Sequence, residues 1–236
     1  MEEIEQRNNN GLKEGVISAI PVIIGYFPVA MAFGLLAKTV NVSLLDSFLF
    51  SLLVFAGASQ FMALDLIKAG IATGDIIIAT LLLNLRHIMM SASLSVRLKE
   101  SKKKWLLFIA FGITDETFAV ASLKKGPLTR AFLLALQGLS YIAWVSGSVV
   151  GYLVGAVLPM TLQSSLGIGL YAMFAAILTP EIRKSLNVLI LSIISGLIYF
   201  IIYYFHLLPS GWDLIGTIIL SSGIGLMVLK DEEEVI

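Results

Sequence analysis

Residues 131–180 read AFLLALQGLSYIAWVSGSVVGYLVGAVLPMTLQSSLGIGLYAMFAAILTP, and this stretch contains no Asp, Glu, Lys or Arg. An α-helix needs about 20 predominantly apolar residues to cross a bilayer. The stretch is long enough for two such helices, and Pro159 lies between them. It therefore predicts two membrane-spanning segments.

The composition of the whole chain extends this prediction. Hydrophobic residues make up 58% of the 236 residues and charged residues 14%, against about 45–50% and about 25% in soluble domains. Because backbone polar groups in lipid must bond within helices or closed barrels, we expect an all-α polytopic integral membrane protein. The net charge of zero indicates no nucleic-acid partner. The absence of Cys and the presence of only two His argue against a metal site.

Charges and Pro or Gly breaks divide the chain into seven or eight apolar segments, numbered here in chain order. These segments lie at about 15–37, 47–67, 75–96, 105–123, 130–158, 164–179, 186–206 and 212–229. We expect a polar N-terminal tail over 1–14, a single transmembrane domain over 15–229 and an acidic C-terminal tail over 230–236.

Segments three and four each have a polar centre. Arg86 and His87 interrupt segment three, and Asp115 and Glu116 interrupt segment four. Each segment resembles two half-spans, which predicts broken or re-entrant helices in this part of the chain. The alternative is that segment three is an ordinary span.

The basic residues constrain the topology. Residues 97–104 contain five Lys or Arg and residues 124–130 contain three. Both clusters favour the cytoplasm, although segment four lies between them. We therefore expect segment four to enter the membrane and return, with a helix break at 112–114. Segments one to three and five to seven would then form an inverted repeat. The side of the N-terminus stays open, because it depends on whether segment three is also re-entrant.

Small residues recur at a spacing of four in two segments. Gly147, Gly151 and Gly155 do so in segment five, and Ala30 and Gly34 do so in segment one. Such residues let helix backbones approach closely. The pattern predicts a helix interface, whose partner is either within the chain or in another chain.

The first candidate site group is Asn84, Arg86 and His87. A charge at the bilayer centre costs about 2.5–3.5 kcal/mol on insertion scales, so Arg86 needs a partner or water. On a continuous helix, Asn84 and His87 share one face and Arg86 points nearly opposite. This arrangement suits a binding cavity, or alternatively a fixed structural ion pair.

The second group is Thr114, Asp115 and Glu116. Two adjacent carboxylates in an apolar segment need a cation, a proton or helix-end amides, and Arg86 is the obvious counter-charge. Burial raises the pKa of a carboxylate, and a neighbouring guanidinium lowers it. A carboxylate subject to both effects is suited to carry a coupling proton. Open amides at a helix start near Thr114 could also hold a substrate carboxylate. The alternative is a capped helix start at shallow depth.

The third group is the stretch FAGASQF at 55–61. Its glycine permits close approach of a ligand or a bend in the backbone, although ordinary helix packing explains the same pattern. The candidate binding residues here are Gly57, Ser59 and Gln60. The aromatic residues that could receive an apolar side chain are Phe55, Phe61 and Phe118.

Together these motifs resemble the AzlC family, the larger subunit of branched-chain amino acid efflux permeases. The matching stretches are GYFPVAMAFG at 25–34, FAGASQF at 55–61, NLRH at 84–87 and TDETFA at 114–119. The resemblance implies a permease of the cytoplasmic membrane and a small, separately encoded partner similar to AzlD. Many members carry an acidic residue at the start of the sixth segment, whereas LGIGLYAMFAAIL at 166–178 has none.

These observations favour a secondary transporter that exports leucine, isoleucine, valine or analogues by alternating access, with a proton as the default coupling ion. Channel-like permeation of another small solute and a non-transporting scaffold are the alternatives. The sequence contains no GxSxG, HExxH or P-loop motif, so neither an enzyme nor a bound cofactor is expected.

Overall fold

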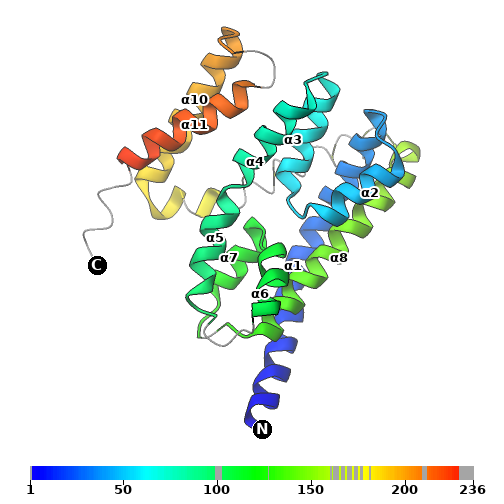
Figure 1. Ribbon diagram of the computed structural model, residues 1–236, viewed down its shortest axis with the longest axis vertical. Helices are drawn as coiled ribbons and strands as arrows, with labels where there is room; N and C mark the ends of the chain where they lie inside the picture. Colours follow the sequence, from blue (N-terminus) through cyan, green and yellow to red (C-terminus); the bar gives the residue numbers. More distant parts are fainter. Residues whose placement is uncertain are drawn as a thin grey trace. The chain divides into compact units, whose positions relative to one another are not determined.

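The computed structural model describes residues 2–98, 103–126, 128–159, 161, 165, 168, 172, 175, 178–180, 182–208 and 212–228. Regular secondary structure within these residues is helical throughout (Figure 1). The acidic tail at 230–236 and most of the predicted sixth segment lie outside the described residues.

The helices follow one another with short connections, and the chain divides into two compact units. Unit 1 comprises residues 1–64 and 84–171, and unit 2 comprises residues 65–83 and 172–236. The elements are α1 (Glu2–Thr39), α2 (Leu44–Leu53), α3 (Gly57–Lys68), α4 (Thr73–Asn84), α5 (Arg86–Ser95), α6 (Lys103–Phe111), α7 (Asp115–Leu123), α8 (Arg130–Val154), the 3-10 turn η1 (Gly155–Val157), α10 (Leu186–Tyr204) and α11 (Trp212–Val228).

Helices α1 and α8 lie side by side along most of their length and form the core of unit 1 (Figure 1). A Cβ atom added at Gly34 would collide with the backbone of Ser148 and Tyr152, and one added at Gly151 would collide with the backbone of Met31. The small-residue pattern therefore marks a real interface, and its partner lies within the same chain. Close backbone approach is what such residues provide in membrane helices.

Among the residues that the structure describes, four helical stretches are long and apolar enough to cross a membrane. They are Asn10–Thr39, Thr73–Ser95, Arg130–Val154 and Leu186–Tyr204. The bent pair Trp105–Phe111 and Asp115–Leu123 counts as a fifth if it is one broken span. A polytopic helical protein is confirmed at this level, whereas the total of seven or eight segments and the inverted repeat stay predictions.

Segment four is broken where the sequence predicts it. Helix α6 ends at Phe111 and α7 begins at Asp115, and the two helices differ in direction by 114°. Glycine at position 112 permits this turn, because a Cβ there would lie 2.7 Å from the Cβ of Gln137 in α8.

Both ends of this broken segment lie at one end of unit 1. Arg97, which follows α5, donates to the carbonyl oxygens of Ala121 at 3.0 Å and Gly126 at 2.9 Å, where segment four ends. The guanidinium of Arg130 lies 5.1 Å from the ring centroid of Trp105, where segment four begins. Segment four therefore folds as a helical hairpin.

Segment three is interrupted much less than segment four. Only Leu85 separates α4 from α5, and its backbone stays in the α-helical region (φ −55°, ψ −28°). Thr73–Ser95 accordingly counts as one stretch of 23 residues. The expectation of two distinct half-spans holds for segment four and not for segment three, because segment three has no glycine or proline at its centre.

The apolar segment at 47–67 is broken near its centre. Helix α2 ends at Leu53 and α3 begins at Gly57. The ends of both helices at this break lie against α1, since the ring of Phe33 in α1 lies 6.4 Å from that of Phe50 and 5.8 Å from that of Phe61. Carbonyl groups freed at the break are bonded by side chains, as described below, and this offsets the lost helical hydrogen bonds.

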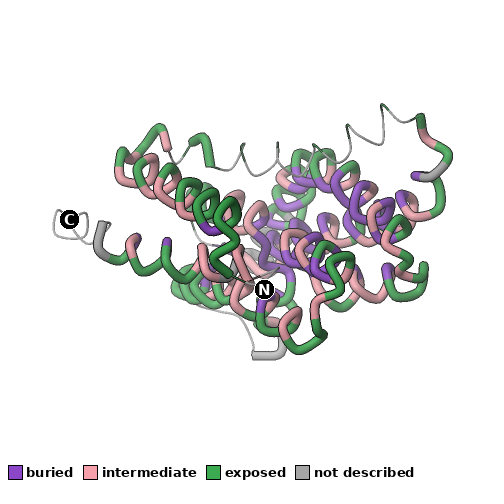
Figure 2. The backbone as a smooth tube through the Cα atoms, turned by 90° about the horizontal axis from the view of Figure 1, so that it is seen from above, coloured by how far each residue is buried: buried purple, intermediate pink, exposed green. Residues whose placement is uncertain are grey.

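Unit 2 is less buried than unit 1. Figure 2 shows the buried stretches concentrated in part of the chain, and most of those residues belong to unit 1. In unit 2, α10 packs against α11, and a Cβ at Gly225 would lie 3.2 Å from Leu191. Many apolar residues of α10 are exposed, including Ile193, Leu197 and Phe200, as expected for a surface that faces lipid or another protein.

Candidate functional site

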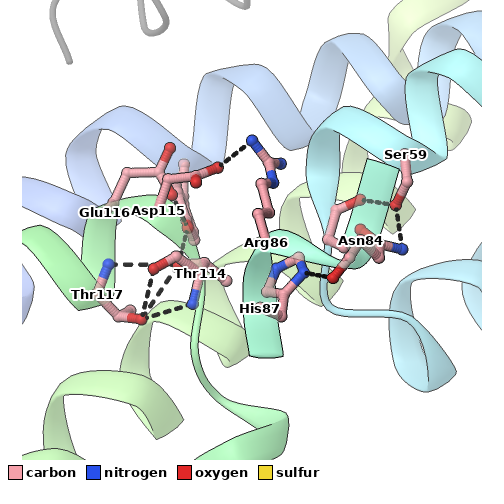
Figure 3. A network of polar contacts seen from close by, with 10 residues as sticks. Ser59, Asn84, Arg86, His87, Thr114, Asp115, Glu116 and Thr117 are labelled. Carbon is pink, nitrogen blue, oxygen red and sulfur yellow. Dashed lines mark hydrogen bonds and ion pairs between the residues drawn. The ribbon is translucent and has the colours of Figure 1, made fainter. Parts of the chain in front are cut away.

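The predicted ion pair between segments three and four is present. The Nη1 atom of Arg86 lies 3.0 Å from Oδ2 of Asp115 (Figure 3). Arg86 is the first residue of α5 and Asp115 is the first residue of α7. The side chains keep 33% and 23% of their surface exposed within the chain, so the pair is buried only in part.

Two atoms beside this ion pair lack hydrogen-bond partners. Nε of Arg86 and Oδ1 of Asn84 are both buried and unpaired among the described residues. The amide nitrogen of Asn84 donates to Oγ of Ser59 at 3.1 Å, and Ser59 donates to the carbonyl of Ala56 at 2.9 Å. An unpaired buried donor or acceptor costs about 1–3 kcal/mol. One free donor and one free acceptor together suit a ligand that carries a negative group and a positive group.

Glu116 has a different set of partners from Asp115. Its carboxylate contacts the hydroxyl of Tyr26 in α1, which also contacts Oγ1 of Thr114. Among the side chains that the structure describes, no Lys, Arg or His nitrogen lies within 4.0 Å of the Glu116 carboxylate. Successive helical residues point about 100° apart, which separates the two neighbouring carboxylates.

Thr114 caps the start of α7. Its side chain accepts from the Thr117 backbone at 3.3 Å, and its own backbone donates to the Thr117 hydroxyl at 2.9 Å. This reciprocal arrangement is a capping box. Helix α7 thus has a capped start, as in the alternative for this group. The backbone amide of Thr117 already has the Thr114 side chain as its partner.

Gln60 is held entirely within the protein. Its amide nitrogen donates to the carbonyls of Phe50, at 3.0 Å, and Val54. Its Oε1 accepts from the indole nitrogen of Trp144 at 3.0 Å. Gly57 lies against the same indole ring, and a Cβ there would approach it to 2.5 Å. In this structure both residues stabilise the break between α2 and α3.

One face of α8 supports both broken segments. Gln137 donates to the carbonyl of Ile109 near the end of α6 at 3.1 Å, and Tyr141 donates to the carbonyl of Leu52 near the end of α2 at 2.6 Å. Trp144 holds Gln60 as described above. The spacing 137, 141 and 144 is that of one helix face, and this was the signal in the sequence for a shared role.

Aromatic rings connect the two breaks. Phe55, in the first break, and Phe111, at the second, lie 6.5 Å apart, and both contact Tyr141 at 5.3 and 5.6 Å. Phe55 and Phe61 are buried among these neighbours, whereas Phe118 is only partly buried. His87 lies beside the ion pair, with Nδ1 3.0 Å from the carbonyl of Asn84.

Tyr26 was not among the predicted site residues, although it is 3% exposed and bonded to two of them. A tyrosine hydroxyl in the middle of an apolar segment needs a partner when buried. That requirement was the signal in GYFP at 25–28 that could have identified it.

A bundle of apolar helices in which two segments are broken, with an ion pair beside the α6–α7 break, defines a class of polytopic membrane proteins with an internal polar site. The family model described as "AzlC protein" matches residues 21–158, which is more than half of the chain. The chain is therefore a membrane protein of the AzlC family.

Several curated relatives agree with this assignment. An uncharacterized membrane protein of Archaeoglobus fulgidus is 38% identical over 72% of this chain and 76% of its own length. The inner membrane protein YgaZ of Escherichia coli is 31% identical over 78% of each chain. The branched-chain amino acid transport protein AzlC of Bacillus subtilis is 25% identical over 58% of this chain and 55% of its own. No solved structure matches.

Proposed function

We propose that this protein is a secondary-transporter subunit that exports branched-chain amino acids, or analogues of them, across the cytoplasmic membrane. The observation that carries the proposal is the Arg86–Asp115 ion pair, with the unpaired Nε of Arg86 and Oδ1 of Asn84 beside it. The name of the Bacillus subtilis relative supports the choice of branched-chain substrates.

The charges of the ion pair match those of a zwitterion. A substrate carboxylate would bind the guanidinium of Arg86, and its ammonium group would bind Asp115 and the free oxygen of Asn84. The substrate would thus replace each partner of the pair with an equivalent charge, which limits the cost of separating them. Phe118, which is only partly buried, would contact the apolar side chain of the substrate.

The remaining candidate residues would act around this centre. His87 and Glu116 flank the ion pair, and Thr114 fixes the start of α7. Ser59 orients Asn84 through its hydroxyl, while Gly57 and Gln60 keep α3 against α8.

We also propose that both broken segments are re-entrant hairpins. The α6–α7 hairpin would enter from the side that holds the two basic clusters, the cytoplasm. Lys124 pairs with Glu14, so the beginning of α1 would lie on that side too. The α2–α3 hairpin would enter from the opposite side. An inverted repeat would relate the two hairpins and the helix that precedes each of them.

Counterflow in proteoliposomes tests this function. Purified protein is reconstituted with unlabelled leucine inside, and uptake of labelled leucine is measured against competing amino acids. A transporter gives transient accumulation that isoleucine and valine suppress, and Asp115→Asn abolishes it. A channel gives only equilibration, and a scaffold gives no flux, so either result contradicts the proposal.

The resemblance to the AzlC family adds a proposed partner, a small AzlD-like membrane subunit. Co-expression with the candidate subunit, followed by purification through a tag on one chain only, tests this interaction. The partner is expected to remain bound in mild detergent and to raise the counterflow rate. Recovery of this chain alone, with full activity, would contradict it.

A further inference from the structure

A chain of hydroxyl groups leads from Glu116 to the break between α6 and α7. The Tyr26 hydroxyl contacts both Glu116 and Thr114. The Thr114 hydroxyl lies 3.2 Å from that of Thr117, and the Thr117 hydroxyl lies 3.0 Å from the carbonyl of Gly112. These residues all belong to unit 1, and Figure 3 shows Thr114 and Thr117 beside Glu116.

The hydrogen atoms in this chain can be counted. A hydroxyl group donates once and accepts up to twice. Thr117 accepts from the backbone and the hydroxyl of Thr114 and donates to Gly112. Thr114 donates to Thr117 and accepts from the Thr117 backbone, so it has room for one more donor. The hydrogen of Tyr26 can fill that place.

Tyr26 has one hydrogen and two neighbouring acceptors, the Thr114 hydroxyl and the Glu116 carboxylate, so it donates to one of them at a time. When Tyr26 donates to Thr114, its contact with Glu116 is a hydrogen bond only if a protonated Glu116 supplies the hydrogen, and the Thr114 hydroxyl donates to Thr117. When Glu116 is ionised, Tyr26 donates to the carboxylate, and the Thr114 hydroxyl turns from Thr117 to donate to Tyr26. The two protonation states of Glu116 therefore differ in the hydrogen bond between Thr114 and Thr117 at the start of α7.

We propose that Glu116 carries the coupling proton and that Tyr26 is the positioning residue that transmits its loss to the α6–α7 break. This inference rests on the proposed transport function and assigns separate roles to the two carboxylates. Asp115 stays ionised as the partner of Arg86, and Glu116 exchanges one proton with water.

The charged groups around Glu116 fit this division. Helix α5 contributes Arg86 and His87, α7 contributes Asp115, and α1 contributes Tyr26. On α8, the polar side chain beside the break is the neutral Gln137. Arg86 is bonded to Asp115. Loss of the proton from Glu116 would place a second negative charge beside this pair. It would favour binding of a substrate ammonium group, and it would turn the Thr114 hydroxyl away from Thr117 at the start of α7.

Infrared difference spectroscopy between low and high pH tests this assignment without any substrate. Wild type is expected to show the C=O stretch of a protonated buried carboxyl, which Glu116→Gln removes and Asp115→Asn retains. Tyr26→Phe should shift the band, since the carboxyl loses its hydroxyl partner. Tyr141→Phe, which removes a hydroxyl from the same aromatic cluster, should leave it unchanged. A band that survives Glu116→Gln, or that disappears in Asp115→Asn, overturns the proposal.

Transport supplies a second readout. A glutamine at 116 can donate to Tyr26 and so mimics the protonated state. Glu116→Gln should therefore lower leucine counterflow to a level that no longer depends on pH, and it should lose accumulation driven by a pH gradient by at least tenfold. Retained gradient-driven accumulation overturns the inference. If wild type itself shows no leucine counterflow, the transport function fails instead, and the infrared result still decides whether Glu116 holds the proton.

Discussion

Arg97 donates to the carbonyl oxygen of Gly126 at 2.9 Å and thereby joins the end of α5 to the loop that follows α7. It also binds the carbonyls of Ala121 and Ser122 at 3.0 and 3.1 Å. These contacts bring Arg97 to the end of unit 1 at which the basic cluster of 124–130 begins. Lys and Arg near membrane ends favour the cytoplasmic side. A hairpin in segment four allows the basic residues before and after it to lie on that side, whereas a single crossing would place one group outside.

This arrangement predicts which introduced cysteines a reagent outside the cell can reach. The chain contains no Cys, so each substitution adds a single one. Lys13→Cys and Lys125→Cys should resist a membrane-impermeant maleimide in intact cells and react after permeabilisation. Thr39→Cys should react in intact cells, because 26 helical residues at about 1.5 Å each span about 39 Å. Opposite labelling of Lys13→Cys and Lys125→Cys would contradict the shared side that the Lys124–Glu14 ion pair indicates.

The ion pair predicts a non-additive pair of substitutions. Arg86→Gln or Asp115→Asn alone leaves a charge without its partner, and each should lower stability by about 1–3 kcal/mol, less than in a fully buried pair because both groups are partly exposed. The double variant should recover most of that loss. Thermal unfolding in detergent measures the stabilities, and all three variants should lose counterflow. Strictly additive losses would show that the two side chains do not interact.

The sequence identified this pair and the break at 112–114 for the same reason: charges and a glycine inside an apolar segment have few ways to be accommodated. For the break at 54–56 it offered only a glycine that permits a bend, because that segment contains no charge near its centre. There the deciding contacts come from distant residues, with Tyr141 bonded to Leu52 and Trp144 bonded to Gln60. Local composition carries no signal for such tertiary hydrogen bonds.

The helix interface predicts a contrast between two glycines of α8. A Cβ at Gly151 would collide with the backbone of Met31, whereas one at Gly138 meets nothing within 4 Å. Gly151→Ala should therefore lower the unfolding free energy by about 1–3 kcal/mol through overpacking. Gly138→Ala should be neutral or slightly stabilising, since alanine is the better helix former. Equal melting temperatures for the two variants would show that α1 and α8 do not pack as described.

Gln60 offers a way to separate structural support from substrate binding. Gln60→Leu leaves the carbonyl of Val54 and the indole nitrogen of Trp144 without their partner, while the carbonyl of Phe50 keeps only its bond from the Val54 backbone. Tyr141→Phe leaves only the carbonyl of Leu52 unpaired.

Since each unpaired buried group costs about 1–3 kcal/mol, Gln60→Leu should destabilise the protein clearly more than Tyr141→Phe. Thermal unfolding in detergent compares the two variants, and counterflow is then measured at a temperature where both stay folded. If Gln60 supports the α2–α3 break, the Gln60→Leu variant should lose transport only in proportion to its loss of stability. Abolished counterflow with a wild-type melting temperature would instead make Gln60 a direct substrate ligand.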